Sequence, residues 1–237
     1  MGPFTLFVSR APWPYYARPR VGGAPHAFTR EDVSAVHARQ EELGVPQMFE
    51  WVHETAPTLR AAIDADVIAV PLLVLDRAHW RPAQAPAGVS LRVLAHDDLA
   101  LVAALGVEHV GFGAPGTAPG PQAVVERDVY EVDAARLEYV RERLRRGTSV
   151  TAVAENGHGP VAVGTLRPVG TVAEIVGVAT LPAVRRQGLG GAVTALLVEH
   201  ALSLGAETVF LSAASDDVAR VYERLGFRRT GTACFVQ

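Results

Sequence analysis

Hydrophobic and polar residues alternate in three consecutive stretches of the second half of the chain. These stretches are SVTAVAEN, GPVAVGTLRP and TVAEIVGVATL, which span residues 149–156, 159–168 and 171–181 and are joined by short glycine-bearing turns. Alternation with a period of two residues indicates half-buried strands. Because the joining turns are short, we predict an antiparallel meander of three strands.

The segments after the meander alternate between helix and strand patterns. A helix is expected to begin near residue 188 and to end at Gly205, with apolar residues at helical spacing on one face: Val193, Leu196, Leu197, Ala201 and Leu204. The remaining segments predict a strand in ETVFLSA, a short helix in DDVARVYERLGF that ends at Gly226, and a last strand or hairpin in RRTGTACFVQ.

The first 88 residues predict a smaller unit with the order β-α-β-α-β. A short strand at 1–10 precedes APWPYYARPRVGGAPHAF, whose aromatic and proline-rich composition argues against any regular element. Thr29 has the position of an N-cap for a helix through Leu43. The other elements are a strand in PQMFEWV, a helix in ETAPTLRAAIDAD and a buried strand in VIAVPLLVLD.

We place a domain boundary after residue 88, because RAHWRPAQAPAG at 77–88 has the composition of a linker. Residues 89–237 form the larger domain. It begins with a strand in VSLRVL and a helix that Asp97 or Asp98 caps and that ends near residue 108. GFGAPGTAPGPQ at 111–122 is expected to be a mobile loop, and DAARLEYVRERLRRG at 133–147 a helix.

Composition narrows the class of protein. Of the 237 residues 49% are hydrophobic, which is enough for a sizeable core. The net charge of −3 disfavours a nucleic-acid binder, because such a protein needs a basic surface. The longest apolar run, VIAVPLLVL, is far shorter than the roughly 20 residues that cross a bilayer, and no export signal opens the chain. We therefore expect a cytoplasmic protein with neither nucleic acid nor membrane as a partner.

Disulfide and metal chemistry are not expected. The chain has a single cysteine, Cys234, so it cannot form an internal disulfide. The eight histidines do not fall in a metal-ligand spacing such as H-E-x-x-H, so we expect no metal site.

LPAVRRQGLGGAV at 181–193 predicts an anion site. Three glycines in four positions stand between a predicted strand and a predicted helix, although glycine costs roughly 0.5–1 kcal/mol against alanine inside a helix. Free N–H groups and the positive end of the helix dipole converge at such a start and bind anions. Arg185 and Arg186 add charge that can bind phosphate oxygens in pairs, so a diphosphate ligand fits.

Two phosphate-binding motifs do not fit this stretch. All 22 cationic side chains are arginine, and the P-loop requires a lysine. The dinucleotide motif G-x-G-x-x-G would need a glycine at Val193, and it needs a parallel βαβ unit where we predict an antiparallel meander. Coenzyme A remains as the diphosphate ligand.

The chain resembles the GNAT superfamily of acyl-CoA-dependent N-acyltransferases. The family's signature [RQ]-x-x-G-x-[GA] is present as Arg185, Gly188 and Gly190, and Pro182 stands three residues before the arginine. VYERLGF at 221–227 resembles the family's tyrosine-containing helix and its glycine-phenylalanine end. The resemblance covers about residues 89–237, with motif-level detail in 171–232. The alternative interpretation is that the glycines only form a flexible turn before an ordinary core helix.

The resemblance implies a fold, a co-substrate and a binding site. The fold is α/β (α+β), with a mixed, mostly antiparallel sheet flanked by helices, and residues 1–88 resemble part of a second GNAT-like unit. The co-substrate is acetyl-CoA, whose diphosphate the loop and helix start would bind: Arg185, Arg186, Gln187, Gly188, Leu189, Gly190 and Gly191. Many relatives use an asparagine seven residues before the tyrosine, where this chain has Ser215. The serine hydroxyl can make a shorter contact, or Asp216 caps the helix and the cofactor is held elsewhere.

Direct attack of an amine on the thioester needs two proton transfers. An amine with a pKa around 10 must lose a proton, and a thiolate with a pKa near 8.5 must gain one. Glu174 lies on an otherwise small and apolar strand, where burial raises the pKa of a carboxyl, and AEIVG resembles the segment with the glutamate base in several GNAT enzymes. The other interpretation of Glu174 is a sheet-face glutamate paired with an arginine.

Tyr222 has the position of the family's tyrosine, which implies that it is the general acid, since a phenol can donate a proton to the sulfur. The alternative is a core aromatic residue that packs with Val218 and Leu225. The backbone N–H groups of Val178, Ala179 and Thr180 would polarise the thioester carbonyl, because this strand lies beside the pantetheine arm in relatives.

Two functions follow, from different classes. One is an acetyltransferase that acts on a small-molecule or peptide amine, with residues 1–88 as a wall of the acceptor pocket or a homodimer contact. The other is a non-catalytic acyl-CoA sensor or interaction module. The presence of both Glu174 and Tyr222 favours the enzyme. The sequence does not identify the amine.

Overall fold

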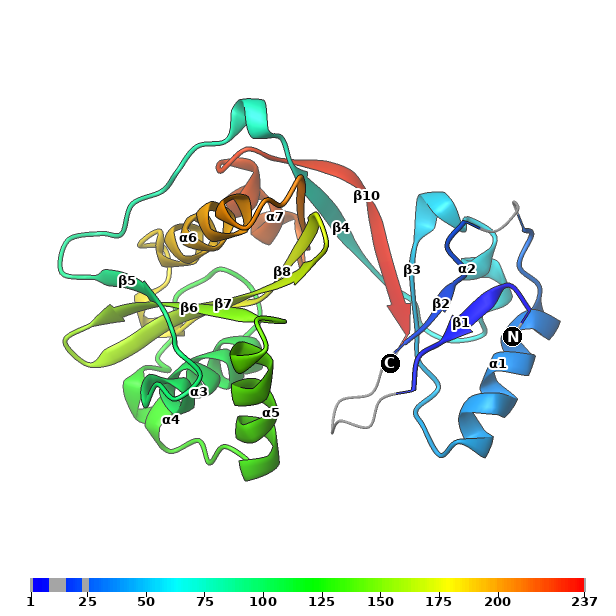
Figure 1. The fold of residues 1–237 in the computed structure, drawn as a ribbon, viewed down its shortest axis with the longest axis horizontal. Coiled ribbons are helices and arrows are strands. Elements are labelled where there is room, and N and C mark those ends of the chain that lie inside the picture. The colour runs from blue at the N-terminus through cyan, green and yellow to red at the C-terminus, as the bar shows by residue number, and fades with distance from the viewer. Residues whose placement is uncertain (1, 9–15, 23–25, 237) are drawn as a thin grey trace. The chain divides into compact units, whose positions relative to one another are not determined.

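The computed structural model describes residues 2–8, 16–22 and 26–236 (Figure 1). The chain forms two compact units. Unit 1 consists of Met1–Leu72 together with Thr230–Gln237, and unit 2 of Leu73–Arg229. The strands β4 (Ile68–Leu75) and β10 (Phe227–Val236) each contribute residues to both units. The units therefore divide within two strands, whereas the boundary at residue 88 stays a prediction.

Unit 1 is a small sheet with one long helix. Its elements are β1 (Phe4–Leu6), β2 (Ala17–Pro19), α1 (Arg30–Glu42), β3 (Phe49–Val52), a 3-10 turn (His53–Thr55), α2 (Leu59–Ala62), the start of β4 and the end of β10. The strand order is β1-β2-β3-β10, in which β2 and β3 run parallel and the other neighbours antiparallel. Its core is aromatic: Phe4 and Phe49 are at most 1% exposed and pack edge to face.

Local chemistry explains where α1 begins and ends. Thr29 caps the helix as predicted, with its hydroxyl accepting from Asp32 N and the Asp32 carboxylate accepting from Thr29 N at 3.0 Å. Gly44 follows the last turn at a φ of +63°, which glycine adopts without steric cost.

Two predictions in unit 1 are wrong. Ala17–Pro19 forms a strand inside the segment that we expected to lack regular structure, because Ala17 is fully buried and pairs with β1 and β3. Residues 11–15 and 23–25 of that segment, like residues 9 and 10 of the strand predicted before it, lie outside the described residues. The helix predicted in 54–66 contracts to the four residues of α2, since Ala56 leaves helical geometry before it and Ile63 becomes extended after it.

Unit 2 is built around the predicted meander. The strands β5 (Ser90–Val93), β6 (Val150–Asn156), β7 (Gly159–Val169), β8 (Val172–Thr180) and β9 (Thr208–Ser212) follow the order β9-β8-β7-β6-β5. All of these neighbours are antiparallel except β8 and β9, which are parallel. This mixed, mostly antiparallel sheet with flanking helices confirms the expected fold class.

Helices cover both faces of the β6–β8 meander. On one face lie α6 (Leu189–Ser203) and then α7 (Asp216–Glu223); on the other lie α3 (Ala100–Gly113), α4 (Val124–Asp128) and α5 (Ala134–Arg145) (Figure 1). Two further 3-10 turns span Arg77–His79 and Pro182–Val184. None of the helices in the described ranges has the length and apolar character that crossing a membrane requires.

The first helix of unit 2 differs from the prediction in length. It continues to Gly113 instead of ending near residue 108. Two glycines let it pack closely: a Cβ on Gly106 would stand 2.6 Å from Arg127 O, and one on Gly111 would stand 2.8 Å from Ala179 Cβ. The short helix α4, which carries the buried Arg127, was not predicted.

Candidate functional site

The glycine-rich stretch forms the start of α6, as predicted. Gly188 is the N-cap with a φ of +83°, a left-handed conformation that favours glycine. The first helical hydrogen bond runs from Ala192 N to Gly188 O at 2.9 Å, so the N–H groups of Leu189, Gly190 and Gly191 precede it. A Cβ on Gly191 would meet no atom within 4 Å, and one on Gly190 would meet Thr180 Oγ1 at 3.5 Å. The protein's own packing therefore does not require bare backbone at these two positions.

The guanidinium of Arg185 binds the protein's own backbone, whereas the sequence predicted that it would bind phosphate oxygens. Its guanidinium donates to four backbone carbonyls: Gly111 O at 2.9 Å, Ala114 O at 2.6 Å, Ala118 O at 3.2 Å and Thr180 O at 3.2 Å. Burial lowers the pKa of Arg185. The side chain therefore ties the segment after α3 to the end of β8.

The segment 111–122 is anchored, although its composition led us to expect a mobile loop. Besides the bonds from Arg185, Gly120 N donates to Pro182 O at 3.1 Å and Ala183 N donates to Gln122 O at 2.9 Å. The bonds from Arg185 thus fix the first part of the segment, and pairing with the 3-10 turn before the glycines fixes its last part.

Arg186 and Gln187 are exposed beside Gly188. Arg186 has a φ of +67°, the one positive value among the described residues other than glycine. Such a conformation costs a bulky residue about 1–2 kcal/mol. The exposed Arg186 therefore has a strained backbone two residues before Gly188, the N-cap of α6.

A bulge interrupts β8 beside this helix. The register of β7 and β8 shifts between Val163 and Thr165, opposite Gly177, whose φ is +63°. Val178 and Thr180 follow the bulge, and their side chains are the neighbours that a Cβ on Gly190 would meet. The structure therefore brings Val178 and Thr180 to the start of α6, whereas the Ala179 side chain between them lies against Gly111 of α3.

The pairing of β8 with β9 ends early. Its register pairs run from Val172–Thr208 to Glu174–Phe210, whereas β8 continues to Thr180. Within the described residues, the second half of β8 thus has backbone groups on this edge that β9 does not pair. These groups lie on the same strand as the predicted contacts to the thioester.

Tyr222 is a buried residue of the last helix, α7. Tyr222 is 6% exposed, its ring packs edge to face with Phe227 at 6.2 Å, and its hydroxyl has no hydrogen bond to the described part of the chain. Burial raises the pKa of Tyr222, so the phenol is protonated at neutral pH.

Ser215 is the N-cap of α7 and accepts from Val218 N at 3.3 Å, whereas Asp216 pairs with Arg229 at 2.5 Å. Ser215, not Asp216, therefore caps this helix.

Glu174 is half-buried on β8, three residues before the bulge. Its register partners are Arg167 on β7 and Phe210 on β9. Side chains of a register pair share one face of a sheet, so Glu174 lies on the face that Arg167 occupies.

Glu108 lies on the same side of the sheet and was not among the residues predicted from the sequence. Glu108 is the sole carboxylate in the apolar helix α3, and that isolation was the signal available in the sequence. A Cβ on Gly177 would stand 3.6 Å from Glu108 Oε1, so the carboxylate lies against the bulge. Burial raises the pKa of Glu108, although Arg136 and Arg167 lower it.

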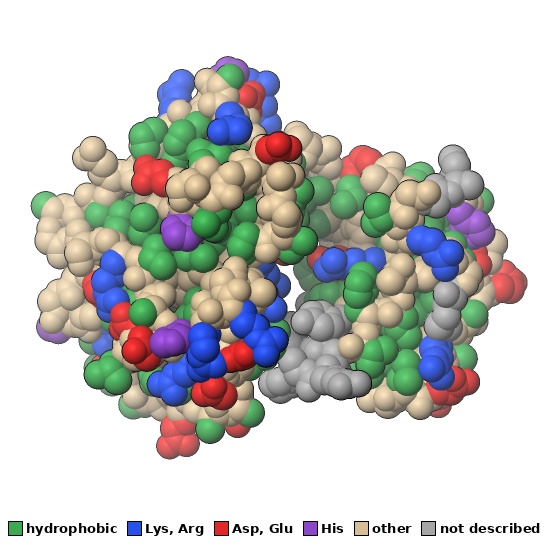
Figure 2. Space-filling model, in the orientation of Figure 1, with side chains coloured by type: hydrophobic (Ala, Val, Ile, Leu, Met, Phe, Trp, Pro, Cys, Tyr) green, Lys and Arg blue, Asp and Glu red, His purple; other side chains and the backbone are tan. Residues whose placement is uncertain are grey.

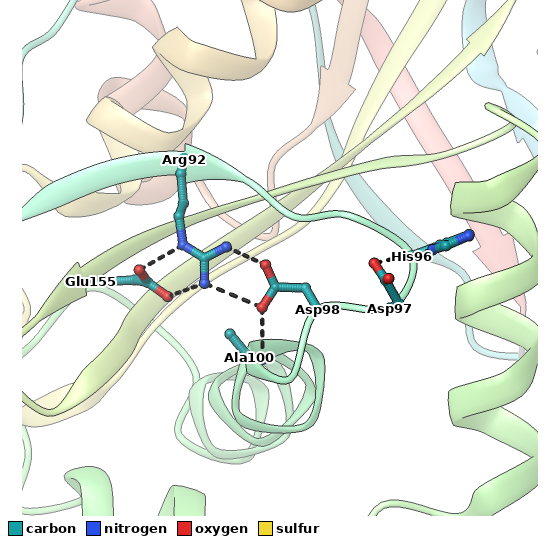
Figure 3. Close-up of polar contacts among 6 residues, drawn as sticks. All are labelled: Arg92, His96, Asp97, Asp98, Ala100 and Glu155. Atoms are coloured by element: carbon teal, nitrogen blue, oxygen red, sulfur yellow. Dashed lines mark hydrogen bonds and ion pairs between the residues drawn. The ribbon is translucent and has the colours of Figure 1, made fainter.

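A charged cluster fixes the start of α3, the helix that carries Glu108 (Figure 3). Arg92 Nε and Nη2 donate to the two oxygens of Glu155 at 2.8 Å and 2.9 Å, and Arg92 also binds Asp98. Asp98 Oδ1 accepts from Ala100 N at 2.9 Å, and these bonds lower the pKa of Asp98. Asp98 is thus the acid that binds the helix start, while Asp97 contacts His96 at 3.3 Å.

Charged side chains of both signs alternate on the visible face of unit 2 (Figure 2). Along α5 they form ion pairs, such as Glu138 with Arg145 at 3.6 Å. Short-range pairing of this kind offsets the charges along α5.

Known proteins share this architecture. Residues 118–227 match the model of the acetyltransferase (GNAT) family. The chain is similar to a GCN5-related N-acetyltransferase from Kribbella flavida, with 21% identity, a TM-score of 0.63 and coverage of 93% of this chain and 79% of that chain. It is also similar to a tandem GNAT protein from the clavulanic acid biosynthesis pathway, with 16% identity, a TM-score of 0.60 and coverage of 95% and 74%. No curated protein matches the chain.

Proposed function

We propose that the chain belongs to the GNAT acetyltransferase family, whose model matches residues 118–227, and that it transfers an acetyl group from acetyl-CoA to a primary amine. The family uses acetyl-CoA as its co-substrate. The observation that carries the proposal is the start of α6: a Cβ on Gly191 would stand in open space and one on Gly190 would meet only ordinary contacts, so the packing of the protein itself requires glycine at neither position.

This start of α6 fits the diphosphate of a coenzyme A. The N–H groups of Leu189, Gly190 and Gly191 precede the first helical bond and can donate to phosphate oxygens. The absence of a Cβ at Gly190 and Gly191 lets a phosphate approach the backbone. Arg186 supplies the charge, while Arg185 supports the site by holding segment 111–118 against Thr180.

Acetyl-CoA supplies the acetyl group as a thioester. In the transfer, the amine nitrogen forms a bond to the acetyl carbon, the carbon–sulfur bond breaks, the nitrogen loses a proton and the sulfur gains one. We assign the polarisation of the carbonyl to backbone N–H groups of residues 178–180, beyond the point where β8 leaves β9. Tyr222, protonated and without a protein partner for its hydroxyl within the described residues, is the proposed donor to sulfur.

Glu174 is the proposed acceptor of the amine proton. A half-buried carboxylate on β8 can take a proton directly or through one water. Glu174→Gln keeps the shape and removes the base, so kcat should fall most at low pH, where the amine is hardest to deprotonate. Acetyl-CoA affinity should stay unchanged, and wild-type activity at every pH would remove Glu174 from this role.

Release of CoA thiol against a panel of primary amines tests the proposed function. Amine-dependent release by the wild type, lost in Tyr222→Phe and in Gly190→Leu, is the expected result. Acetyl-CoA binding without amine-dependent release would make the protein an acyl-CoA sensor. Absence of acetyl-CoA binding would contradict both functions.

A further inference from the structure

Glu108 has one carboxylate oxygen with a partner and one without. Glu108 Oε2 accepts from Arg136 Nη2 at 3.3 Å, and Arg136 Nη1 donates to Tyr130 OH at 3.2 Å. Among the described residues no hydrogen-bond donor reaches Oε1. The Glu108 side chain is 32% exposed, so Oε1 can receive a ligand.

The free oxygen faces the bulge of β8. Oε1 lies 3.6 Å from the place where a Cβ on Gly177 would stand, and the position directly after Gly177 begins the backbone proposed to bind the thioester. A side chain at position 177 would lie between this oxygen and the strand. The glycine therefore keeps Oε1 next to the proposed site of transfer.

The charges around Glu108 come from three elements. Arg136 lies on α5, Arg167 on β7, and Glu174 is the register partner of Arg167 on β8. The ring of His109, the neighbour of Glu108, stacks on Tyr130 at 4.0 Å. The pKa of Glu108 is raised in spite of two guanidinium groups, because burial outweighs their effect. A carboxylate with one oxygen that accepts no hydrogen bond from the described residues gains from a further cationic donor.

From this geometry we infer that Glu108 Oε1 binds the cationic nitrogen of the acceptor, so that the protein selects acceptors that arrive as ammonium ions. The inference rests on the proposed function and names its acceptor subsite. Arg136 holds the carboxylate through Oε2 and leaves Oε1 directed at the bulge. Glu108 thus provides binding and specificity, whereas Glu174 is proposed for the proton transfer.

A matched pair of ligands tests this subsite without catalysis. Benzylamine is a cation at neutral pH, and benzyl alcohol is its neutral counterpart of nearly equal size. Each is titrated by NMR into the protein loaded with CoA, for the wild type and for Glu108→Gln. Loss of a hydrogen bond to a charged group should weaken benzylamine binding roughly 10- to 100-fold and leave benzyl alcohol unchanged.

The control is Glu138→Gln on α5, whose carboxylate is 63% exposed and pairs with Arg145. It should keep the wild-type preference for benzylamine. The preference should also fall in the wild type as the pH drops through the raised pKa of Glu108, and it should be independent of pH in Glu108→Gln. An unchanged acetyl-CoA-induced rise in Tm shows that each variant is folded.

The outcomes separate this inference from the proposed function. A wild type without preference for the cation, including one that binds neither ligand, overturns the inference, as does a preference that survives in Glu108→Gln. If acetyl transfer occurs but the preference for benzylamine over benzyl alcohol does not depend on Glu108, the proposed function stands and the subsite is rejected. A preference that depends on Glu108 without transfer to any amine supports the subsite and contradicts the proposed function.

Discussion

Replacing Arg185 with alanine separates two roles for the arginine of the glycine motif. The sequence suggests a phosphate ligand, whereas in the structure the guanidinium donates to four backbone carbonyls of three segments. If the arginine supports the fold, its loss is a loss of stability. If it binds phosphate, its loss is a loss of affinity for acetyl-CoA.

The size of the effect follows from these bonds. A hydrogen bond to a charged group contributes about 1.5–3 kcal/mol, and four bonds from one partly exposed side chain are far from additive. We therefore expect Arg185→Ala to lower the free energy of unfolding by about 2–4 kcal/mol. For a chain of this length each kcal/mol corresponds to a Tm change of about 2–4 °C.

Denaturant unfolding without ligand measures this loss, and acetyl-CoA titration measures the affinity. Arg186→Ala is the matched control, because it removes the neighbouring exposed guanidinium, which the structure places at the start of α6. The account predicts that Arg185→Ala mainly destabilises and that Arg186→Ala mainly weakens binding. Wild-type stability of Arg185→Ala together with a large loss of affinity would refute the reasoning.

Three further predictions concern other residues. Tyr222→Phe should reduce kcat by roughly 10²–10⁴-fold if the phenol protonates the sulfur. The unfolding free energy should change little, because the described residues provide no partner for the hydroxyl. A large loss of stability with normal turnover would make Tyr222 a core residue. Arg186→Gly should raise the unfolding free energy by about 0.5–1 kcal/mol, because glycine relieves the positive φ, and a destabilised variant would contradict this strain. Asp98 has a lowered pKa in the folded protein, so its contribution to stability is complete above its unfolded pKa of about 3.9 and is lost as the pH falls through the lower folded value. The unfolding free energy of Asp98→Asn should therefore lack this part of the dependence on pH in the acid range. A pH profile equal to that of the wild type would show that Asp98 makes no such contribution.

Periodicity and motif spacing were sufficient for most of unit 2. The meander and the helix after the glycines follow from local signals: alternation, an apolar helical face and glycine at a helix start. These elements have propensities that agree with their packing, so tertiary contacts did not override the pattern.

The errors arose where packing opposed local propensity. Helix α3 passes through Gly106 and Gly111 because these glycines let it approach Arg127 and Ala179 closely, a contact that sequence spacing does not reveal. Segment 111–122 has the composition of a mobile loop, yet Arg185, far along the chain, donates to its carbonyls.

The candidate site was predictable in its backbone and less so in its side chains. Glycines at the start of α6 follow from motif spacing, but the partners of Arg185 and the capping role of Ser215 depend on which groups lie nearby in space. Glu108 escaped notice because a single acid in an apolar helix acquires meaning only beside the bulge at Gly177.

Thermal unfolding with and without acetyl-CoA, in the wild type, Gly190→Leu and Gly157→Leu, tests the central claim most directly. A Cβ at Gly190 meets ordinary contacts of 3.5 Å and 3.8 Å and one at Gly157 meets none within 4 Å, and the Tm without ligand shows whether each variant is folded. Acetyl-CoA at 100 times its Kd should stabilise the wild type and Gly157→Leu by about 2.7 kcal/mol. In Gly190→Leu, whose side chain is larger than the alanine that the family signature accepts at this position, most of this stabilisation should be lost. An equal stabilisation of all three proteins would contradict binding of acetyl-CoA at the start of α6.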